Sequence, residues 1–258
     1  MSKVSIQPIA LWQSVLIFGV PGVLILLGVV YLVPHMTGAG IPLIFAWSAS
    51  VLVPTIGNAI VIVGVYLWKE RPDRNTFIER FRLQKMTRRQ WLLVPAIFVL
   101  ILFLNEMMAW TIPVLREIPL FAPAASTPEI MKDPYVALSD GISTFMGVAL
   151  TPENWWLFPF WLIWVVGGVL GEELVWRGYL LPRHEASYGR WAWLVNGTLW
   201  NVPFHLYTLS NFFADMPFYF ILPFVTQRLR STWFAIVIHA LLISMAYIII
   251  VAGMVSSR

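Results

Sequence analysis

Long runs without charge are the sequence feature that most restricts the fold of this chain. Within residues 4–68 the only ionisable side chain is His35. A helix that crosses a bilayer needs about 20 predominantly apolar residues. The turn-forming stretch 34–42 divides the run into two such helices, predicted over residues 9–33 and 42–68. The first is far longer than the apolar region of a signal peptide, so we expect it to be retained as a membrane helix.

Composition extends this conclusion to the whole chain. Of its 258 residues, 59% are hydrophobic and only 12% are charged, whereas soluble domains have about 45–50% apolar and about 25% charged residues. This hydrophobicity excludes a disordered chain. The absence of cysteine excludes disulfides, thiol nucleophiles and thiolate metal sites. We therefore expect an all-α, polytopic transmembrane bundle of about seven to eight spans, forming a single integral membrane domain over residues 1–258.

The distribution of basic residues predicts how the chain crosses the membrane. Lysine and arginine gather after the second, fourth and sixth apolar segments, whereas the gap at 113–153 is acidic. By the positive-inside rule this indicates a cytoplasmic N-terminus, and we expect the cell membrane. The sequence leaves open whether residues 135–150 form an additional short helix that dips into the bilayer. Seven spans are predicted over residues 9–33, 42–68, 91–112, 154–181, 190–209, 212–229 and 232–254.

The most basic segment, residues 69–90, carries eight lysines and arginines against three acidic residues. Apolar side chains at Phe77, Ile78, Phe81 and Leu83 alternate with these charges. This pattern predicts a helix lying on the anionic cytoplasmic leaflet of the lipid bilayer. We interpret the excess charge as topological and expect no nucleic-acid partner.

Two adjacent carboxylates and a guanidinium lie inside the predicted span 154–181. Each charge costs about 2.5–3.5 kcal/mol at the centre of a membrane helix, so retained charges indicate an internal pair or a function. Glu173 and Arg177 are four residues apart on one helix face and are predicted to neutralise each other. Glu172 points about 140° away from Arg177 and is expected to lack an in-helix partner. The alternative is that both glutamates face water or headgroups at the helix end.

Two of the four histidines, His205 and His239, lie inside predicted spans, whereas His35 and His184 are expected in loops. A single intramembrane histidine is typical of a hydrogen bond between helices. Two histidines and a glutamate at similar depth instead predict a catalytic cluster with a glutamate general base. The same three side chains, Glu172, His205 and His239, could hold Zn²⁺ with a water in the fourth position. The sequence does not decide between metal-dependent and metal-free chemistry.

The segment GEELVWRGYL, residues 171–180, resembles the first motif, Glu-Glu-x-x-x-Arg, of the CAAX-protease and bacteriocin-processing family of intramembrane prenyl endopeptidases. The resemblance covers residues 154–250, which would form the catalytic core. The second family motif is Phe-x-x-x-His, but Asn201 stands four residues before His205 and Trp200 stands five before it.

The third family motif is His-x-x-x-Asn or Asp, and Ile243 stands four residues after His239. Asn201, Asn196 and Ser244 are the nearby polar residues that could replace the missing donor. Asn58, Asn105 and Glu106 are further candidates for the same cavity, although hydrogen bonds between spans are the commoner role of such residues.

The resemblance implies an intramembrane peptidase acting on a peptide or protein substrate, prenylated in this family, that enters from the membrane. Glu172 and His205 would activate a water for attack on the peptide carbonyl, and His239 would stabilise the oxyanion. Glu173, Arg177 and Asn201 would support the site. The sequence does not distinguish CAAX chains, signal remnants and bacteriocin leaders as substrates.

Two other functions would use the same residues. A proton-coupled transporter would employ Glu172, His205 and His239 as a relay, although no inverted halves are visible in the sequence. A non-catalytic membrane partner, such as an immunity protein on the same scaffold, is favoured by the apolar Ile243.

Overall fold

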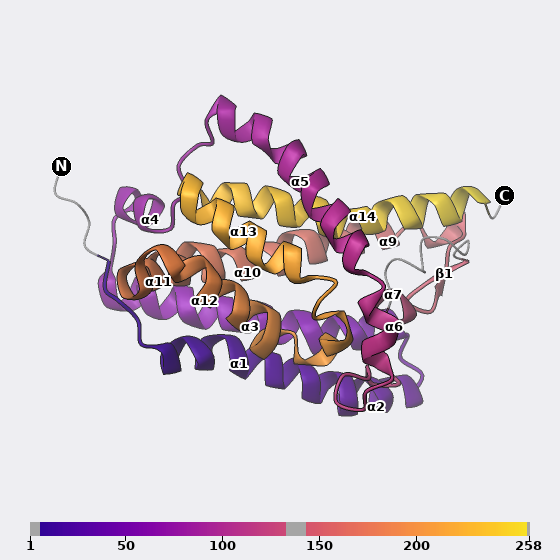
Figure 1. Cartoon of the computed structure of the whole chain (residues 1–258). Coiled ribbons are helices and arrows are strands. Elements are labelled where there is room, and N and C mark those ends of the chain that lie inside the picture. The colour runs from indigo at the N-terminus through magenta and orange to yellow at the C-terminus, as the bar shows by residue number, and fades with distance from the viewer. Residues whose placement is uncertain (1–5, 133–142, 257–258) are drawn as a thin grey trace.

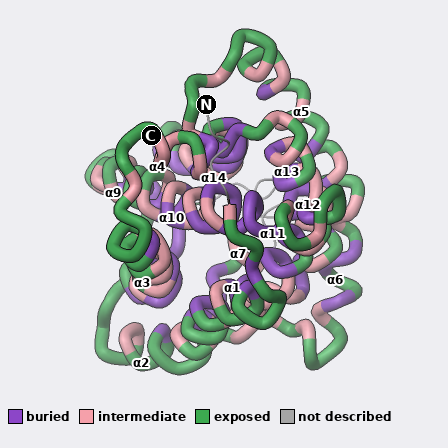
Figure 2. The backbone as a smooth tube through the Cα atoms, turned by 90° about the vertical axis from the view of Figure 1, so that its left-hand side faces the viewer, coloured by how far each residue is buried: buried purple, intermediate pink, exposed green. Residues whose placement is uncertain are grey.

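Helices make up nearly all of the computed structural model, which describes residues 6–132 and 143–256 (Figure 1). The all-α class predicted from the sequence is confirmed, and the long apolar helices make this a multi-pass membrane protein. Large apolar side chains such as Val53, Ile60, Leu92 and Phe103 are exposed on the outer helices, as lipid contact requires. Figure 2 shows buried residues toward the centre, where α10 and α14 lie. Within the described residues, five helical segments are long and apolar enough to cross a membrane: Leu11–Gly38, Leu43–Glu70, Arg88–Met108, Pro152–Phe204 and Thr232–Val255.

The first span is longer than predicted because the helix passes through Pro34. A proline amide cannot donate, and a π-helical turn placed directly before it accommodates the missing bond. His35, which we expected in a loop, therefore lies on a helix. The elements of this span are α1 (Leu11–Leu27), the π-helical turn η1 (Gly28–Leu32) and α2 (Val33–Gly38), which pack against α3 (Leu43–Glu70).

The basic segment forms a short helix, α4 (Arg74–Arg80), as predicted. The carboxylate of Asp73 accepts a hydrogen bond from the amide of Thr76 at 2.7 Å and so caps the helix. Phe81, which follows the helix, is fully buried and packs against Tyr66 on α3. The segment is therefore anchored on the protein through Phe81, and its placement on the lipid leaflet stays a prediction.

The described residues of the acidic gap form short elements. After α5 (Arg88–Met108) come α6 (Thr111–Arg116), α7 (Glu129–Lys132) and a hairpin of β1 (Thr144–Phe145) and β2 (Val148–Ala149). Met146 and Gly147, the two residues of its turn, have φ values of 48° and 79°, which is the pattern of a type I′ turn. The open question of a helix at 135–150 is answered for 144–149 by these strands, and residues 133–142 lie outside the described residues.

The apolar segment 152–204 runs in one direction and then reverses at Gly189, whose φ is 55°. The predicted loop at 182–189 is helical, and His184 within it is fully buried, with Nε2 2.8 Å from the hydroxyl of Ser14. The outward part comprises η2 (Pro152–Asn154), α9 (Leu157–Ile163), η3 (Trp164–Gly168), α10 (Val169–Glu173), η4 (Leu174–Leu180) and α11 (Leu181–Tyr188). The return comprises η5 (Gly189–Trp191), α12 (Ala192–Leu199) and the π-helical turn η6 (Trp200–Phe204).

The C-terminal part comprises η7 (Leu206–Asn211), α13 (Met216–Leu229) and α14 (Thr232–Ser256). The 14 residues of α13 correspond to about 21 Å of helix, short of the roughly 30 Å hydrocarbon core. For this reason α13 is not among the five spanning candidates of the described chain, and the expected number of seven to eight spans stays a prediction.

A close approach between α1 and η6 positions the site. A Cβ atom on Gly22 would lie 1.9 Å from the carbonyl oxygen of Pro203, so only glycine allows this contact. Phe18, four residues earlier on α1, stacks on Trp176 with ring centroids 4.1 Å apart. The first helix therefore contacts both helical arms of the 152–204 reversal and fixes their relative position.

Candidate active site

The two adjacent glutamates at the end of α10 reach different partners. Glu173 and Arg177 are fully buried, and Arg177 Nε lies 3.3 Å from Glu173 Oε2. The ion pair predicted from their four-residue spacing is therefore confirmed. Because both groups are away from solvent, each needs the other to offset the loss of hydration.

Glu173 has a second partner on α14. Its Oε1 lies 2.8 Å from Nδ1 of His239. A carboxylate only accepts, so the proton is on Nδ1 and the ring orientation is fixed. Glu173 thus joins the cation on η4 to the histidine on α14.

Arg177 is held from its other side by an aromatic face. Its guanidinium carbon lies 3.6 Å from the ring centroid of Trp200, and a desolvated cation over tryptophan gains about 2 kcal/mol or more. Nη1 and Nη2 have no hydrogen-bond partner among the described residues. The stacked ring and Glu173 therefore provide its stabilisation.

Glu172 faces an internal cavity. The sequence suggested that it lacks a partner on its own helix, but the structure provides one. Its Oε2 accepts hydrogen bonds from two indole nitrogens, Nε1 of Trp200 at 2.9 Å and Nε1 of Trp176 at 3.4 Å. Trp176 is four residues along the same helical run, so this partner is the in-helix one. Both bonds converge on one oxygen, which leaves Oε1 directed to a ligand or water.

His205 is positioned by a π-helical turn. Its Nδ1 lies 2.8 Å from the backbone carbonyl of Trp200, five residues earlier. In a π-helix residues five apart are neighbours, as residues four apart are in an α-helix. Because of this turn, Trp200 lies next to His205, as a residue four positions earlier would in a regular α-helix.

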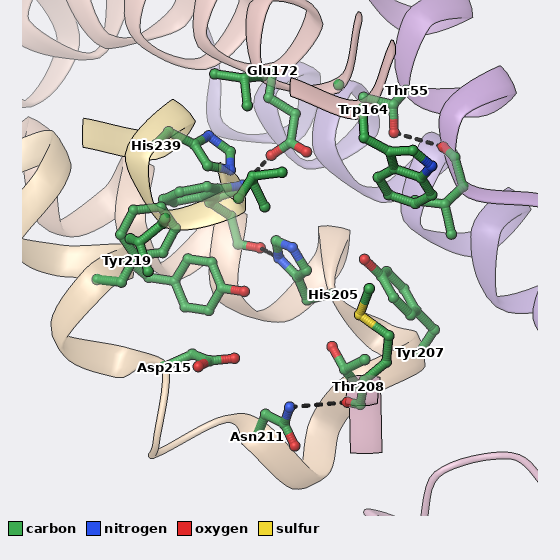
Figure 3. Close-up of a pocket in the computed structure, with 18 of the residues that line it drawn as sticks. Thr55, Trp164, Glu172, His205, Tyr207, Thr208, Asn211, Asp215, Tyr219 and His239 are labelled. Atoms are coloured by element: carbon green, nitrogen blue, oxygen red, sulfur yellow. Dashed lines mark hydrogen bonds between the residues drawn. The ribbon is translucent and has the colours of Figure 1, made fainter. Parts of the chain in front are cut away.

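The three predicted residues Glu172, His205 and His239 line a single cavity of about 240 Å³. Figure 3 shows Glu172 and His239 at one end of it, with His205 beside them. Trp200 contacts all three, since its ring centroid is 5.9 Å from that of His205 and 5.5 Å from that of His239. Helical segments on α10, η6 and α14 thus bring together a carboxylate and two imidazoles that are distant in sequence.

The comparison with protein families matches residues 154–245 to type II CAAX prenyl endopeptidase, Rce1-like. Residues 154–245 therefore resemble the Rce1-like family. The match runs from η2 into α14 and includes Glu172, His205 and His239. The comparisons of the chain with curated proteins and with solved structures gave no match.

The polar residues considered as substitutes in the Rce1-like segment point elsewhere. The amide nitrogen of Asn201 donates to the carbonyl of Phe212 at 3.2 Å, and that of Asn196 donates to the carbonyl of Trp176 at 3.0 Å. Neither they nor Ser244 line the cavity, whereas Ile243 does. Asn201 thus holds the chain after η7, and its support of the site stays a prediction.

The described residues do not fit a metal centre. No three histidine, aspartate or glutamate side chains among them are arranged to hold an ion. The Zn²⁺ set considered from the sequence, Glu172, His205 and His239, is therefore not arranged as a metal site in this geometry.

Trp200 is the site residue that sequence reasoning missed. It is completely buried and contacts Glu172, Arg177 and both cavity histidines. The available signal was its position five residues before His205 with Pro203 between them. A proline inside a helix removes a backbone donor and favours the wider π-helical turn found here.

Proposed function

We propose that this protein is an intramembrane endopeptidase of the type II CAAX class, hydrolysing a peptide bond of a membrane-associated protein substrate. The single observation that carries the proposal is the cavity shared by Glu172, His205 and His239 inside the Rce1-like segment. A half-buried carboxylate with one free oxygen beside two oriented imidazoles is suited to activating water. The resemblance of the segment to a peptidase family supports the same reaction class.

The reaction begins with a water held between Glu172 and His205. Because Nδ1 of His205 faces a carbonyl oxygen, Nε2 is free to accept a hydrogen bond from the water. Glu172 takes one proton as the water oxygen attacks the peptide carbonyl carbon. When the tetrahedral intermediate collapses, Glu172 returns that proton to the leaving amine.

His239 stabilises the negative oxygen of the intermediate. Its Nδ1 proton is held by Glu173. With a second proton on Nε2, the ring donates from that atom to the oxyanion. Arg177 keeps Glu173 in place and balances its charge.

The proposed topology places the N-terminus in the cytoplasm, in the cell membrane, with seven crossings. The five candidate spans are supplemented by the reversal at Gly189, which makes 152–204 a double pass, and by the short helix α13. Short helices cross by thinning the bilayer locally. The basic residues of 69–90 support this orientation.

The test of the function is hydrolysis of defined substrates by the purified protein in proteoliposomes. Prenylated peptides with CAAX ends and unprenylated peptides of the same sequence are incubated with it, and the fragments are identified by mass. Cleavage at one bond is expected for at least one substrate. A protein that binds such peptides without cleaving them would instead be the non-catalytic partner favoured by Ile243 in the cavity wall.

Ile243→Asn is expected to raise the rate of hydrolysis. The side chain lines the cavity one helical turn from His239, so an amide there would add an oxyanion donor. One such donor is typically worth about 10²–10³ in rate, which sets the upper limit of the gain. The measurement is kcat for the variant against wild type, with Ile243→Leu as the size-matched control. An unchanged or lower kcat for the asparagine variant would contradict a role in the oxyanion site.

Trp200→Phe is expected to lower kcat by roughly 10- to 150-fold, because a hydrogen bond to a charged group is worth about 1.5–3 kcal/mol. Phenylalanine keeps a ring under Arg177 but has no N–H for Glu172. KM should change less than kcat, since the lost N–H is directed to Glu172. Trp193→Phe, on α12 and packed against Phe224, is the matched control. A Trp200 variant that changed only KM would rule out the positioning role.

A further inference from the structure

The cavity has a second polar end that the proposed mechanism does not use. Figure 3 shows Asp215, Asn211 and Thr208 at the end away from Glu172, with His205 and Tyr219 between the two ends. All of these residues line the same cavity of about 240 Å³. The far end therefore lies within reach of a substrate whose scissile bond is at Glu172.

Asp215 presents an unpaired carboxylate to this end. It lies just before α13, and its side chain does not cap that helix. Within the described part of the chain its carboxylate has no hydrogen-bond or ion-pair partner. Neither lysine nor arginine is among the described residues that line the cavity. The charge of Asp215 therefore lacks the compensation that a cation would give.

Asn105 supplies a second acceptor that is independent of the first. Only 3% of this residue is exposed, it lines the cavity, and its Oδ1 has no hydrogen-bond partner among the described residues. A buried amide oxygen without a partner costs about 1–3 kcal/mol. Such a cost is recovered when a ligand donates to the oxygen.

The packing of α5 on α13 puts these two acceptors at the same level. Nε2 of Gln90 donates to the carbonyl of Leu229 at 3.1 Å, which fixes the register of the two antiparallel helices. Asn105 is fifteen residues after Gln90, and Asp215 is fourteen before Leu229. At 1.5 Å per residue both lie about 21–22 Å from that contact.

The chemistry of this end selects one kind of ligand. The carboxylate of Asp215 and Oδ1 of Asn105 only accept hydrogen bonds, so a group that binds both must donate. The rings of Tyr207 and Tyr219 flank the space, with centroids 5.8 Å and 4.8 Å from that of His205. Aromatic faces attract ammonium groups as well.

We propose that Asp215 and Asn105 form a substrate subsite for a primary ammonium group, supplied by a lysine side chain or a free amino terminus of the peptide to be cleaved. This proposal rests on the proposed peptidase function. The subsite makes the enzyme selective for a basic group near the scissile bond. Tyr207 and Tyr219 shield the ion pair from water.

The first experiment measures selectivity with paired peptides. One pair carries lysine or norleucine at successive positions beside the scissile bond, and another has a free or acetylated amino terminus, so the two sources are distinguished. Wild type is expected to prefer the ammonium peptide in kcat/KM by roughly 10- to 150-fold, as a charged hydrogen bond provides. The ratio should fall toward one in Asp215→Asn and decrease in Asn105→Leu. Glu153→Gln, which removes an exposed carboxylate outside the cavity, is the control.

Two outcomes overturn the subsite while leaving the peptidase intact: wild type that cleaves both members of each pair equally, and Asp215→Asn that keeps the wild-type preference.

A second experiment does not depend on hydrolysis. Thermal unfolding is followed with n-butylammonium chloride or with sodium chloride at equal concentration. The ammonium salt is expected to raise the Tm of wild type and not that of Asp215→Asn. If no peptide is cleaved, the peptidase proposal fails. If the Tm of wild type is equal in both salts, the subsite proposal fails independently of hydrolysis.

Discussion

Glu172→Gln is expected to lower peptide hydrolysis by roughly 10²- to 10⁴-fold, the usual contribution of a general base. Glutamine has the same shape and keeps an oxygen that can accept from the indoles of Trp200 and Trp176. The variant should therefore fold with a Tm close to that of wild type. Single-turnover rates and thermal unfolding in the same detergent measure the two effects.

Glu153→Gln is the matched control for this variant, because it makes the same substitution at an exposed position outside the cavity. Its rate should equal that of wild type. Near-wild-type activity in Glu172→Gln would mean that another group takes the proton from water. Loss of folding in that variant would mean that Glu172 is structural instead.

Glu173→Ala is expected to destabilise the protein by about 3–5 kcal/mol, the cost of leaving one member of a buried ion pair alone. The change leaves Arg177 fully buried without its counter-ion and removes the partner of Nδ1 in His239. Both the denaturation midpoint and the yield of folded protein should fall. Activity should fall too, because His239 loses its orientation.

The double change Glu173→Leu with Arg177→Met serves as the control for this effect. Replacing both charges by apolar groups of similar size removes the unpaired cation, so stability should return toward that of wild type. Activity should not return, since His239 still lacks its carboxylate. If Glu173→Ala were as stable as Glu172→Gln, the different burial of the two glutamates would not matter to the fold, and the assignment would be wrong.

The parts of the site that depend on local spacing were predictable from the sequence. Glu173 and Arg177 are four residues apart on one helical run, and such neighbours meet whatever the rest of the fold does. The bond from Glu173 to His239 joins α10 to α14 across 66 residues. Nothing in a periodic pattern specifies which helices pack together, so this bond required the structure.

Charge was a less reliable guide where tertiary partners neutralise it. Arg183 and His184 suggested a loop after residue 181, yet both are buried on α11. The guanidinium of Arg183 stacks 3.7 Å from the ring centroid of Tyr179, and His184 bonds to Ser14 on α1. These contacts satisfy polar groups inside the bundle, and they are invisible in a count of charges along the chain.

Asp215 shows the same limit at the substrate cavity. In the sequence Asp215 lies near the start of the predicted span 212–229, and Asn105 was a weak candidate for the cavity. Their common level follows from the antiparallel register of α5 and α13, a relation between helices more than a hundred residues apart. The sequence shows which residues carry acceptor groups, but it does not show that these two residues lie at the same level of the cavity.

The π-helical turn at Trp200–Phe204 also bears on how this site can vary among homologous chains. A helix that gains one residue can absorb it as a single wide turn, and the side chains on either side keep their places. His205 and the aromatic ring before it thus stay in register although five residues separate them instead of four. Sequence patterns with fixed spacing pass over chains that carry such an insertion, whereas patterns that tolerate one extra residue at this turn retain them.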